Sequence, residues 1–334
     1  MTRSPVDPLS AYEPIAASFR SGRLESVHHA AVVALDSDGR ISFAAGDPDL
    51  EIYPRSSMKP LQANAMLAAG LDLPDELLAL VCSSHDGLPQ HLDGVRRILA
   101  SVGLDESALR NTPDLPLDDH EAHGVLRRGG SESSLQQNCS GKHAGMLATC
   151  VSAGWAHDSS YLGDDHPLQR SITDSLPALT AGRVAAIGVD GCGAPAHVIS
   201  LLGLAHSFRN LATGEAGEQG RRVHRAMTSH PEMVGGPRRD VTLVMRGVPG
   251  LMAKDGAEGV FAVALPDGRA VAMKVADGAN RARPPIMRGA LTLLGIDTSS
   301  VDPSAFTSTI LGHGRPVGEV RIVGSLAAAV GSRD

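Results

Sequence analysis

The sequence predicts an α+β fold in which one sheet is built from both chain ends and packs against a block of helices. Segments 27–47 and 259–278 each have the pattern of a β-hairpin, and helical periodicity dominates the stretch between them. We find no internal repeat, low-complexity tract or long linker. Residues 1–334 are therefore expected to form a single domain, with a helical block of about 56–230 inserted between the two parts of the sheet.

Turn signals and apolar patterns define the individual elements. In the first hairpin, apolar β-branched residues flank a Ser-Asp-Gly turn at 37–39, and the second hairpin repeats this pattern late in the chain. Segment 111–124 and the tail from Val301 are loop-like. Helical periodicity predicts helices over Ser56–Gly70, Asp75–Val81, Gln90–Ala100, Ala144–Ala153, Pro167–Leu176, Ala196–Leu211 and Ile286–Leu294.

Composition excludes several classes of function. The net charge of -7 and the 3% aromatic content supply neither a basic stripe nor a stacking surface for nucleic acid. No apolar run is long enough to cross a bilayer, and the first 14 residues lack the apolar core of a secretion signal, so we expect a cytoplasmic protein with no membrane partner. The four cysteines are single and widely spaced, and reduced thiols are the default.

The segment "YPRSSMKPLQA" places Ser56 three residues before Lys59 and follows the lysine with Pro60. Proline is tolerated only in the first turn of a helix, so the helix is expected to begin close to Ser56. Free backbone amides there stabilise an oxyanion, and a buried lysine can lose its proton and activate a serine. Ser56 and Lys59 are thus a candidate nucleophile and base; the alternative is a surface lysine near a capping serine.

Two further segments provide companions for this pair. "VCSSHDG" places Ser83 and Ser84 at a helix end, where a second hydroxyl could relay protons or could simply satisfy the helix terminus. "LMAKDG" puts Lys254 just ahead of a predicted strand. An S-x-x-K serine with a later K-[ST]-G strand is the arrangement of penicillin-recognising hydrolases, although Asp255 replaces the usual Ser or Thr.

The glycine-rich segments "QQNCSGKHAGML" and "IGVDGCGAPAH" both precede helices and are expected to line one cleft. Cys139, Lys142 and Cys192 offer soft ligands for zinc, but lysine is a rare ligand, and spacing alone favours small buried cysteines behind tight turns. His143 could contact a substrate or could be an ordinary capping or packing histidine.

Arg55 and Asp190 could recognise an amino-acid substrate. A guanidinium pairs with a carboxylate and an aspartate pairs with an ammonium group, whereas the alternative for each residue is an ordinary salt bridge or a helix cap. Asp190, in a Val-Asp-Gly-Cys-Gly turn, is the more suggestive of the two.

Taken together and in order, "PRSSMKPLQA", "CSSHDG", "NCSGKHAGML", "GVDGCGAP", "KDGAEGVFA" and "AMKVADG" resemble the rhizobial-type L-asparaginase II family of serine hydrolases, distantly akin to β-lactamases and glutaminases. The resemblance covers nearly the whole chain and implies a β-lactamase/transpeptidase-like arrangement of the α+β fold. The segments that mark the other asparaginase types are missing: neither a Thr-Gly-Gly-Thr segment nor the self-cleaving threonine signature is found.

The resemblance also implies an activity and roles for single residues. It implies hydrolysis of L-asparagine to L-aspartate and ammonia, with Ser56 as nucleophile, Lys59 as base, and Ser84 with Lys254 as a second Ser-Lys pair. Around a zinc ion beside the substrate it places Cys139, Lys142 and Cys192, with Asp190 and Arg55 nearby. Asp86 stands where relatives are expected to have a serine.

Other functions remain open on the sequence alone. The same chemistry could serve glutamine, another amide or a β-lactam ring, and a non-catalytic zinc or amino-acid sensor would keep the same pocket. A homodimer is the expected assembly on general grounds.

Overall fold

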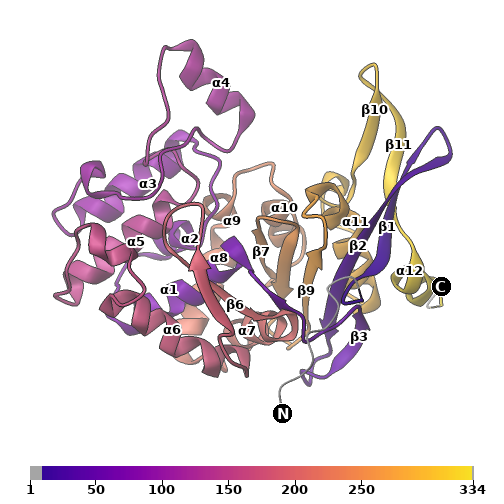
Figure 1. Cartoon of the computed structure of the whole chain (residues 1–334), viewed down its shortest axis with the longest axis horizontal. Helices are drawn as coiled ribbons and strands as arrows, with labels where there is room; N and C mark the ends of the chain where they lie inside the picture. Colours follow the sequence, from indigo (N-terminus) through magenta and orange to yellow (C-terminus); the bar gives the residue numbers. More distant parts are fainter. Residues whose placement is uncertain (1–9, 333–334) are drawn as a thin grey trace.

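The structure is a computed structural model that describes residues 10–332. Residues 1–9, on which part of the expectation of no secretion signal rests, lie outside the described residues, as do 333–334. Figure 1 shows most helices gathered on one side of the molecule and a long twisted sheet on the other. No helix within 10–332 is long and apolar enough to span a membrane.

The main sheet contains strands from both ends of the described chain. Its eight strands are antiparallel, in the order β10-β11-β1-β2-β9-β8-β7, and β3 pairs with β2. The strands are β1 (Glu13–Arg20), β2 (Arg23–Leu35), β3 (Ile41–Ala45), β7 (Met252–Gly256), β8 (Val260–Ala264), β9 (Ala270–Val275), β10 (Thr309–Gly312) and β11 (Arg315–Ile322). The predicted α+β class, with one sheet from both chain ends and hairpins β2–β3 and β8–β9, is confirmed.

Most helices lie between β3 and β7 in the sequence. They are α1 (Lys59–Ala68), α2 (Asp75–Val81), α3 (Pro89–Ala100), α4 (Asp119–Arg127), α5 (Ser140–Ser152), α6 (Pro167–Thr180), α7 (Leu201–Thr213), α8 (Gly217–Ser229), α9 (Pro231–Val234) and α10 (Asp240–Gly247). Two more, α11 (Arg283–Leu293) and α12 (Gly324–Gly331), follow β9 and β11. The 3₁₀ turns are η1 (Arg55–Met58), η2 (Glu106–Ala108), η3 (Ser159–Leu162), η4 (Asn280–Ala282) and η5 (Pro303–Phe306). That the chain is a single domain stays a prediction.

A second, small sheet corrects the predicted helix over 196–211. Residues Pro195–Ser200 form strand β6, which pairs with β4 (Glu51–Ile52) and β5 (Ala186–Val189), and helix α7 begins only at Leu201. The reason is local: the Ser200 side chain accepts a hydrogen bond from the Gly203 amide and caps the helix there. The apolar run before Ser200 is therefore free to pair as a strand.

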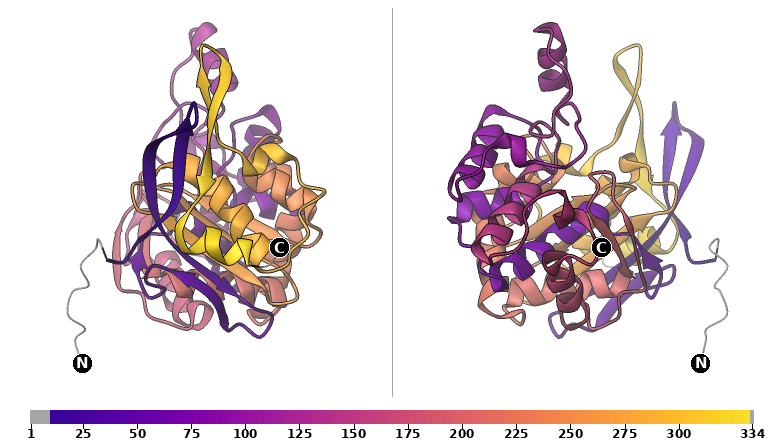
Figure 2. Two further views of the ribbon diagram at one scale, coloured as in Figure 1. Left: turned by 90° about the vertical axis from the view of Figure 1, so that its right-hand side faces the viewer. Right: turned by 60° about the vertical axis from the view of Figure 1, so that its left-hand side comes forward.

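The tail and one loop were also predicted wrongly. The tail from Val301 contains β10, β11 and α12, and β11 pairs with β1 from the other end of the chain. Such pairing is non-local, so no short-range sequence pattern predicts it. Helix α4 occupies the end of the supposed loop 111–124, because Asp118 accepts a hydrogen bond from the Glu121 amide and caps it. Hairpins β1–β2 and β10–β11 and helix α4 project from the body (Figures 1 and 2).

Helix packing on the sheet positions the site. Helix α7 packs against β2, β8 and β9, and α11 packs against β1, β9 and β11. Edge strand β7 contacts η1, the turn that carries Ser56. At this contact only glycine fits at 256, because a Cβ there would lie 2.3 Å from the Pro54 carbonyl oxygen. The end of β7 and the start of α1 are thereby held against each other.

Candidate active site

Ser56 lies in a short 3₁₀ turn directly before helix α1. The turn spans Arg55–Met58, and the α-helix begins at Lys59, with Pro60 in its first turn as expected for a residue without an amide hydrogen. The α-helix therefore starts three residues later than predicted. Arg55 has a φ of 53°, which is uncommon for a non-glycine residue and turns the chain sharply into the segment that presents Ser56.

Ser57 anchors this turn to the sheet. It is fully buried, and its hydroxyl donates a hydrogen bond to the Lys254 carbonyl oxygen at 3.1 Å. Ser56 is half-buried and lines a cleft. Of the two neighbouring serines, Ser56 is thus the one available to a ligand, and Ser57 has a structural contact.

Ser84 lies between two buried lysines. Its hydroxyl receives a hydrogen bond from the Lys59 amine at 3.1 Å and another from the Lys254 amine at 3.0 Å. Lys59 also donates to the Ser83 carbonyl oxygen, and Lys254 donates to the Asp255 carboxylate at 2.7 Å. Both amines are inaccessible to solvent, at 1% and 0% exposure of their residues. Lys254 lies within strand β7 and not ahead of a strand as predicted.

The surroundings of Lys254 favour loss of its proton. Burial lowers its pKa, and the positive charge of Lys59 lowers it further, while Asp255 opposes both, so that the pKa of Lys254 is about 8. The Ser84 hydroxyl links the two amines. A missing proton on either lysine can therefore be shared along the chain Lys59–Ser84–Lys254.

The expected direct pairing of Ser56 with Lys59 is replaced by a shared pocket. Both side chains line one small pocket, but no hydrogen bond joins them within residues 10–332. A catalytic hydrogen bond is often long before substrate binds, so Lys59 stays a candidate base on the ground that it lines the same pocket as Ser56. The lysine amine is buried, as the sequence hypothesis requires.

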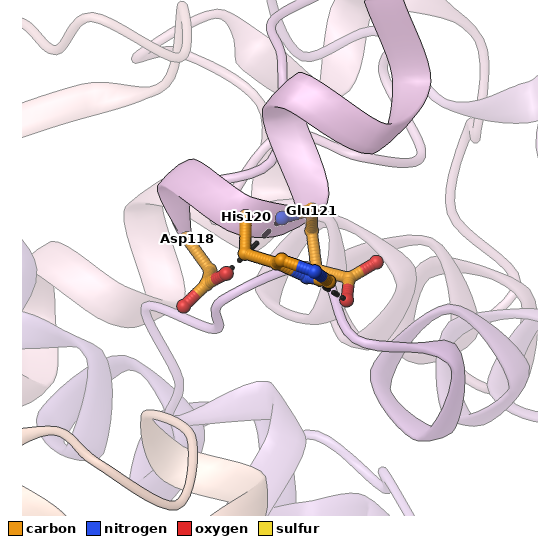
Figure 3. A group of neighbouring side chains, drawn as sticks. All are labelled: Asp118, His120 and Glu121. Atoms are coloured by element: carbon orange, nitrogen blue, oxygen red, sulfur yellow. Dashed lines mark hydrogen bonds and ion pairs between the residues drawn. The ribbon is translucent and has the colours of Figure 1, made fainter. Parts of the chain in front are cut away.

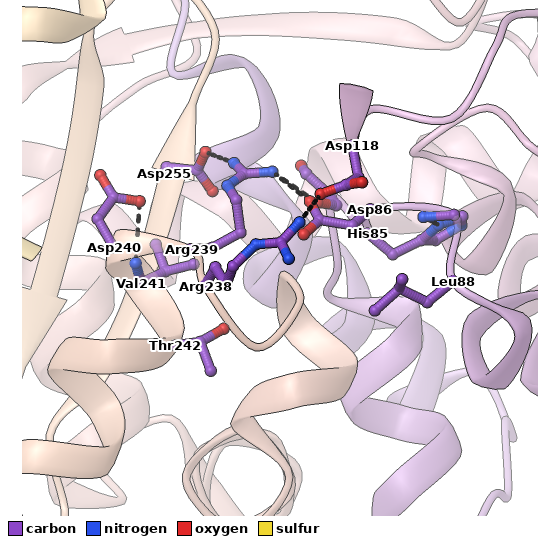
Figure 4. A network of polar contacts seen from close by, with 12 residues as sticks. His85, Asp86, Leu88, Asp118, Arg238, Arg239, Asp240, Val241, Thr242 and Asp255 are labelled. Atoms are coloured by element: carbon purple, nitrogen blue, oxygen red, sulfur yellow. Dashed lines mark hydrogen bonds and ion pairs between the residues drawn. The ribbon is translucent and has the colours of Figure 1, made fainter. Parts of the chain in front are cut away.

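A cleft of about 460 Å³ opens beside Ser56 and Ser84. Arg239 donates to Asp86 at 3.0 Å and also pairs with Asp255, while Arg238 pairs with Asp118 (Figure 4). The cleft is lined by Ser56, Ser84, Asp86, Leu117, Asp118, Asp119, Asn138, Arg238, Arg239, Asp255, Gly256, Ala257, Asn280 and Arg283. Charges of both signs therefore face this space.

Asp255 and Asp86, two departures from the expected motifs, are joined by Arg239. The Asp255 carboxylate also contacts Lys254 and Arg283. Burial acts against its charge, but Lys254, Arg239 and Arg283 hold the pKa of Asp255 well below its usual value. Burial raises the pKa of Asp86, and Arg239 opposes this only in part. The Asp86 side chain lies so close to Gly236 that a Cβ there would overlap it, at 2.0 Å.

Cys139, Lys142 and Cys192 form a second buried cluster. The Lys142 amine lies 3.1 Å from the Cys192 sulfur. A hydrogen bond from the Cys139 thiol lowers the pKa of Cys192 to about 4, with help from Lys142 and against the effect of burial. Contact with Cys192 and burial raise the pKa of Cys139 to about 12. Burial acts against the Lys142 charge, but Cys192 and Cys139 raise its pKa above the usual value. The cluster thus holds a thiolate, a thiol and an ammonium.

Arg55 and Asp190, the two expected substrate-binding residues, pair with each other. The guanidinium nitrogens of Arg55 lie 2.7 and 2.8 Å from one Asp190 carboxylate oxygen. Burial acts against ionisation of Asp190, but Lys142 and Arg55 hold its pKa below the usual value. The pair borders a small pocket of about 10 Å³ that also contacts Ser56, Met58, Lys59, Gln62, Lys142, Pro195, Ala196 and His197.

His143 lies outside both pockets. It is fully buried in α5, and its Nδ1 is 2.8 Å from the Tyr161 hydroxyl. Its Nε2 has no hydrogen-bond partner. Burial, and next to it the charge of Lys142, lower the pKa of His143 well below its usual value, so the ring is neutral. This placement matches the alternative, left open by the sequence, that His143 is a packing histidine.

Asp118, His120 and Glu121 are grouped closely enough to hold a metal ion, and within 10–332 no other group of three His, Cys, Asp or Glu side chains is (Figure 3). Asp118 already caps α4 and pairs with Arg238, and the His120 side chain is 77% exposed. Because exposed acidic groups are common without an ion, we assign no metal to this group.

Sequence reasoning missed Arg239, Arg283, Gln62 and His197. One signal would have sharpened the whole site: the chain has only four lysines among its 30 lysines and arginines, and three of them are at most 2% exposed. Lysine is normally the most exposed residue type, so a chain that uses arginine on its surface and buries its few lysines points to a function for them.

The α+β sheet and a buried serine–lysine cluster that opens on a cleft are compatible with a hydrolase. A family model described as L-asparaginase II matches residues 16–322, and the chain belongs to this family. The expected family is thereby confirmed, and membership supports amidohydrolase activity. No curated protein matches the chain.

Several solved structures match more distantly. A beta-lactamase from Mycobacterium bovis is 16% identical, with 78% of this chain and 93% of that chain covered and a TM-score of 0.41. EstCE1, a hydrolase with promiscuous acyltransferase activity, is 14% identical, with 85% and 94% covered and a TM-score of 0.41. The native form of Mglu is 15% identical, with 75% and 57% covered and a TM-score of 0.34. Likenesses this distant carry no argument about substrate.

Proposed function

We propose that the chain hydrolyses L-asparagine to L-aspartate and ammonia through an acyl-enzyme formed on Ser56. One observation carries the proposal: Ser56 is half-buried where the large cleft and the small polar pocket meet, next to the lysines that share Ser84. A nucleophile needs access to substrate on one side and a base on the other, and Ser56 has both.

In the first step the Ser56 oxygen attacks the side-chain amide carbon of asparagine. The serine proton passes to the neutral amine of Lys59. Lys59 becomes neutral by passing a proton through the Ser84 hydroxyl to the neutral amine of Lys254. The positive end of the α1 dipole stabilises the negative oxygen of the intermediate. The C–N bond then breaks, the lysine proton moves to the leaving nitrogen, and ammonia departs.

In the second step water attacks the aspartyl ester. The same lysine takes a proton from the water, the ester C–O bond breaks, and the proton returns to the Ser56 oxygen. The chain is then restored, with L-aspartate as the second product. Every proton that leaves a reactant in this scheme reaches a named acceptor, and no external oxidant or reductant is needed.

The larger cleft is the proposed site for the amino-acid part of the substrate. Its lining holds three arginines and four aspartates, so both a carboxylate and an ammonium group can find a partner of opposite charge. Arg55 and Asp190 were expected to take these two groups. They line the smaller pocket and not this cleft, so we assign them to the wall next to the amide end of the substrate.

We also propose that Cys139, Lys142 and Cys192 bind a zinc ion. The donor set fits: two sulfurs and one amine converge in a buried site, and one sulfur is already a thiolate. Lys142 would have to release its proton to become a ligand, so binding depends on pH. When bound, the ion would supply positive charge beside the substrate. In the steps above, proton transfer rests on the lysines and Ser84 alone.

Ammonia release from L-asparagine and L-glutamine, and the colour change of a chromogenic β-lactam, test the proposal, with Ser56→Ala and Ser57→Ala compared with the wild type. We expect asparagine turnover in the wild type, its loss by at least about a hundredfold in Ser56→Ala, and much smaller effects in Ser57→Ala. Faster turnover of glutamine or of the β-lactam would mean that this compound, and not asparagine, is the preferred substrate. Bound zinc without hydrolysis of any amide would favour a sensor.

A further inference from the structure

The small pocket beside Ser56 presents two hydrogen-bond acceptors that nothing in the described chain satisfies. Gln62 and His197 both line it, at 3% and 1% exposure. The Gln62 Oε1 and the His197 Nδ1 are buried and have no hydrogen-bond partner. Leaving a buried polar atom unpaired costs about 1–3 kcal/mol, so a pair of such atoms in one pocket points to a ligand that completes them.

The hydrogen bonds around His197 decide which ring nitrogen is the acceptor. The Thr173 hydroxyl donates its only proton to the Gln169 carbonyl oxygen at 2.9 Å. The same hydroxyl lies 2.8 Å from His197 Nε2, so at that contact it can only accept. His197 therefore carries its proton on Nε2, and Nδ1 presents a bare lone pair.

Gln62 reaches the pocket from the helix that starts at the candidate base. It follows Lys59 by three residues on α1, and residues three apart lie on one face of a helix. Lys59, Gln62 and Ser56 all line this pocket. The pocket is thus built onto the same helix face as the proposed chemistry.

Size and charge restrict what the pocket can hold. Its volume of about 10 Å³ is close to that of one water-sized group. Arg55 and Lys142 contribute two cationic side chains against the single carboxylate of Asp190, so another cation such as a substrate ammonium is disfavoured. A neutral group with two N–H donors matches two acceptors, and a primary carboxamide nitrogen is such a group.

We propose that Gln62 and His197 hold the leaving –NH2 group of the substrate and so make the protein selective for primary carboxamides. This rests on the proposed function, because the scissile amide must lie beside Ser56. Oε1 of Gln62 and Nδ1 of His197 each accept one N–H. An N-alkyl group lacks both the second donor and the space, and an ester lacks both donors.

The test compares kcat/KM for L-asparagine with that for the β-methyl ester of L-aspartate. Both substrates give the same acyl-enzyme, so only acylation differs between them. We expect Gln62→Met and His197→Phe to lower the amide-to-ester ratio by about ten- to a hundredfold, as expected for lost hydrogen bonds in a buried site. His197→Asn can place its amide oxygen, a hydrogen-bond acceptor, near the former position of Nδ1 and should therefore recover part of the ratio.

Asn64→Leu is the matched control. Asn64 lies on the same helix, and its Oδ1 is also buried without a partner, but it does not line this pocket. Its substitution should leave the ratio unchanged. A merely structural role for Gln62 or His197 would lower both rates together and leave the ratio constant.

Binding gives a second readout that needs no turnover. In the Ser56→Ala background, L-asparagine should bind, and its N-methyl amide should bind at least about tenfold more weakly, measured by calorimetry. Equal binding of the two, or an unchanged ratio in Gln62→Met and His197→Phe, would overturn the leaving-group pocket alone. If the wild type releases no ammonia from asparagine or glutamine, the proposed function falls, and the pocket assignment falls with it.

Discussion

Lys254 and Lys142 are both buried lysines in the same site, and their neighbours drive their pKa values in opposite directions. Lys254 is 0% exposed and shares Ser84 with a second lysine, and its pKa is lowered to about 8. Lys142 is 2% exposed and faces the thiolate of Cys192, and its pKa is raised. Burial opposes charge at both. The comparison teaches that the neighbouring charge decides which lysine can act as a base.

The two lysine clusters are therefore suited to different roles. The Lys59–Ser84–Lys254 cluster joins helix α1, the segment after α2 and edge strand β7, and the pKa of about 8 lets Lys254 release its proton at moderately alkaline pH. The Cys139–Lys142–Cys192 cluster joins the start of α5 to the loop before β6, and it keeps its ammonium paired. One cluster suits proton transfer, and the other suits an ion pair or a metal.

The largest effect is expected from removing the lysine with the lowered pKa. Lys254→Met should reduce kcat for ammonia release by at least about a hundredfold, because the neutral amine that accepts a proton from Lys59 through Ser84 is lost. Steady-state kinetics on L-asparagine measure it. Lys274→Met is the matched control, since Lys274 lies on β9 of the same sheet, two strands from β7. Within residues 10–332 its amine bonds only to backbone carbonyls, and it lines neither pocket. Equal losses in both variants would contradict the assignment.

A smaller effect is expected at the second cluster. Cys192→Ser should lower the free energy of unfolding by about 1.5–3 kcal/mol, because Lys142 loses a charge-assisted contact in a buried site. The same change should abolish zinc binding. Chemical denaturation in chelator and metal analysis by mass spectrometry measure the two effects. Cys150→Ser, also buried but far from these contacts, should keep its zinc; zinc retained by Cys192→Ser would sink the metal proposal.

The mildest test is a pH profile. The pKa of Lys254 in the folded chain is lowered to about 8, so the neutral amine is the minor form below that pH and the major form above it. The value of kcat should therefore rise about tenfold per unit at low pH and level off above about 8. A profile of kcat between pH 5 and 10 measures this. A rate that falls as pH rises through 8 would mean that a charged lysine is the active form.

The sequence predicted the site better than it predicted the elements around it. Ser56, Lys59, Ser84 and Lys254 were singled out from motifs, and the structure brings all four to the junction of β7 and α1. Short motifs carry this information because their spacing on a helix or beside a turn is local. Strand β6 was taken for helix because its apolar run is continuous with that of α7, and only the capping hydroxyl of Ser200 separates them.

Residues that act through distant contacts could not be predicted. Arg239 pairs with Asp86 and with Asp255, which lie far apart in the sequence, and the tautomer of strand residue His197 is set by Thr173 of helix α6. No periodicity reports such contacts, since each partner alone has an ordinary sequence environment. The mutual pairing of Arg55 with Asp190 is hidden from the sequence for the same reason.

By itself the sequence determined the family and the α+β class and supplied the candidate reactive side chains, because these depend on residue types at fixed local spacing. Only the tertiary structure decided which lysine bears the lowered pKa, that Ser84 joins two amines, and which acceptors lack partners beside Ser56. The physical reason is that a pKa and an unsatisfied hydrogen bond depend on burial and on charges brought close by folding.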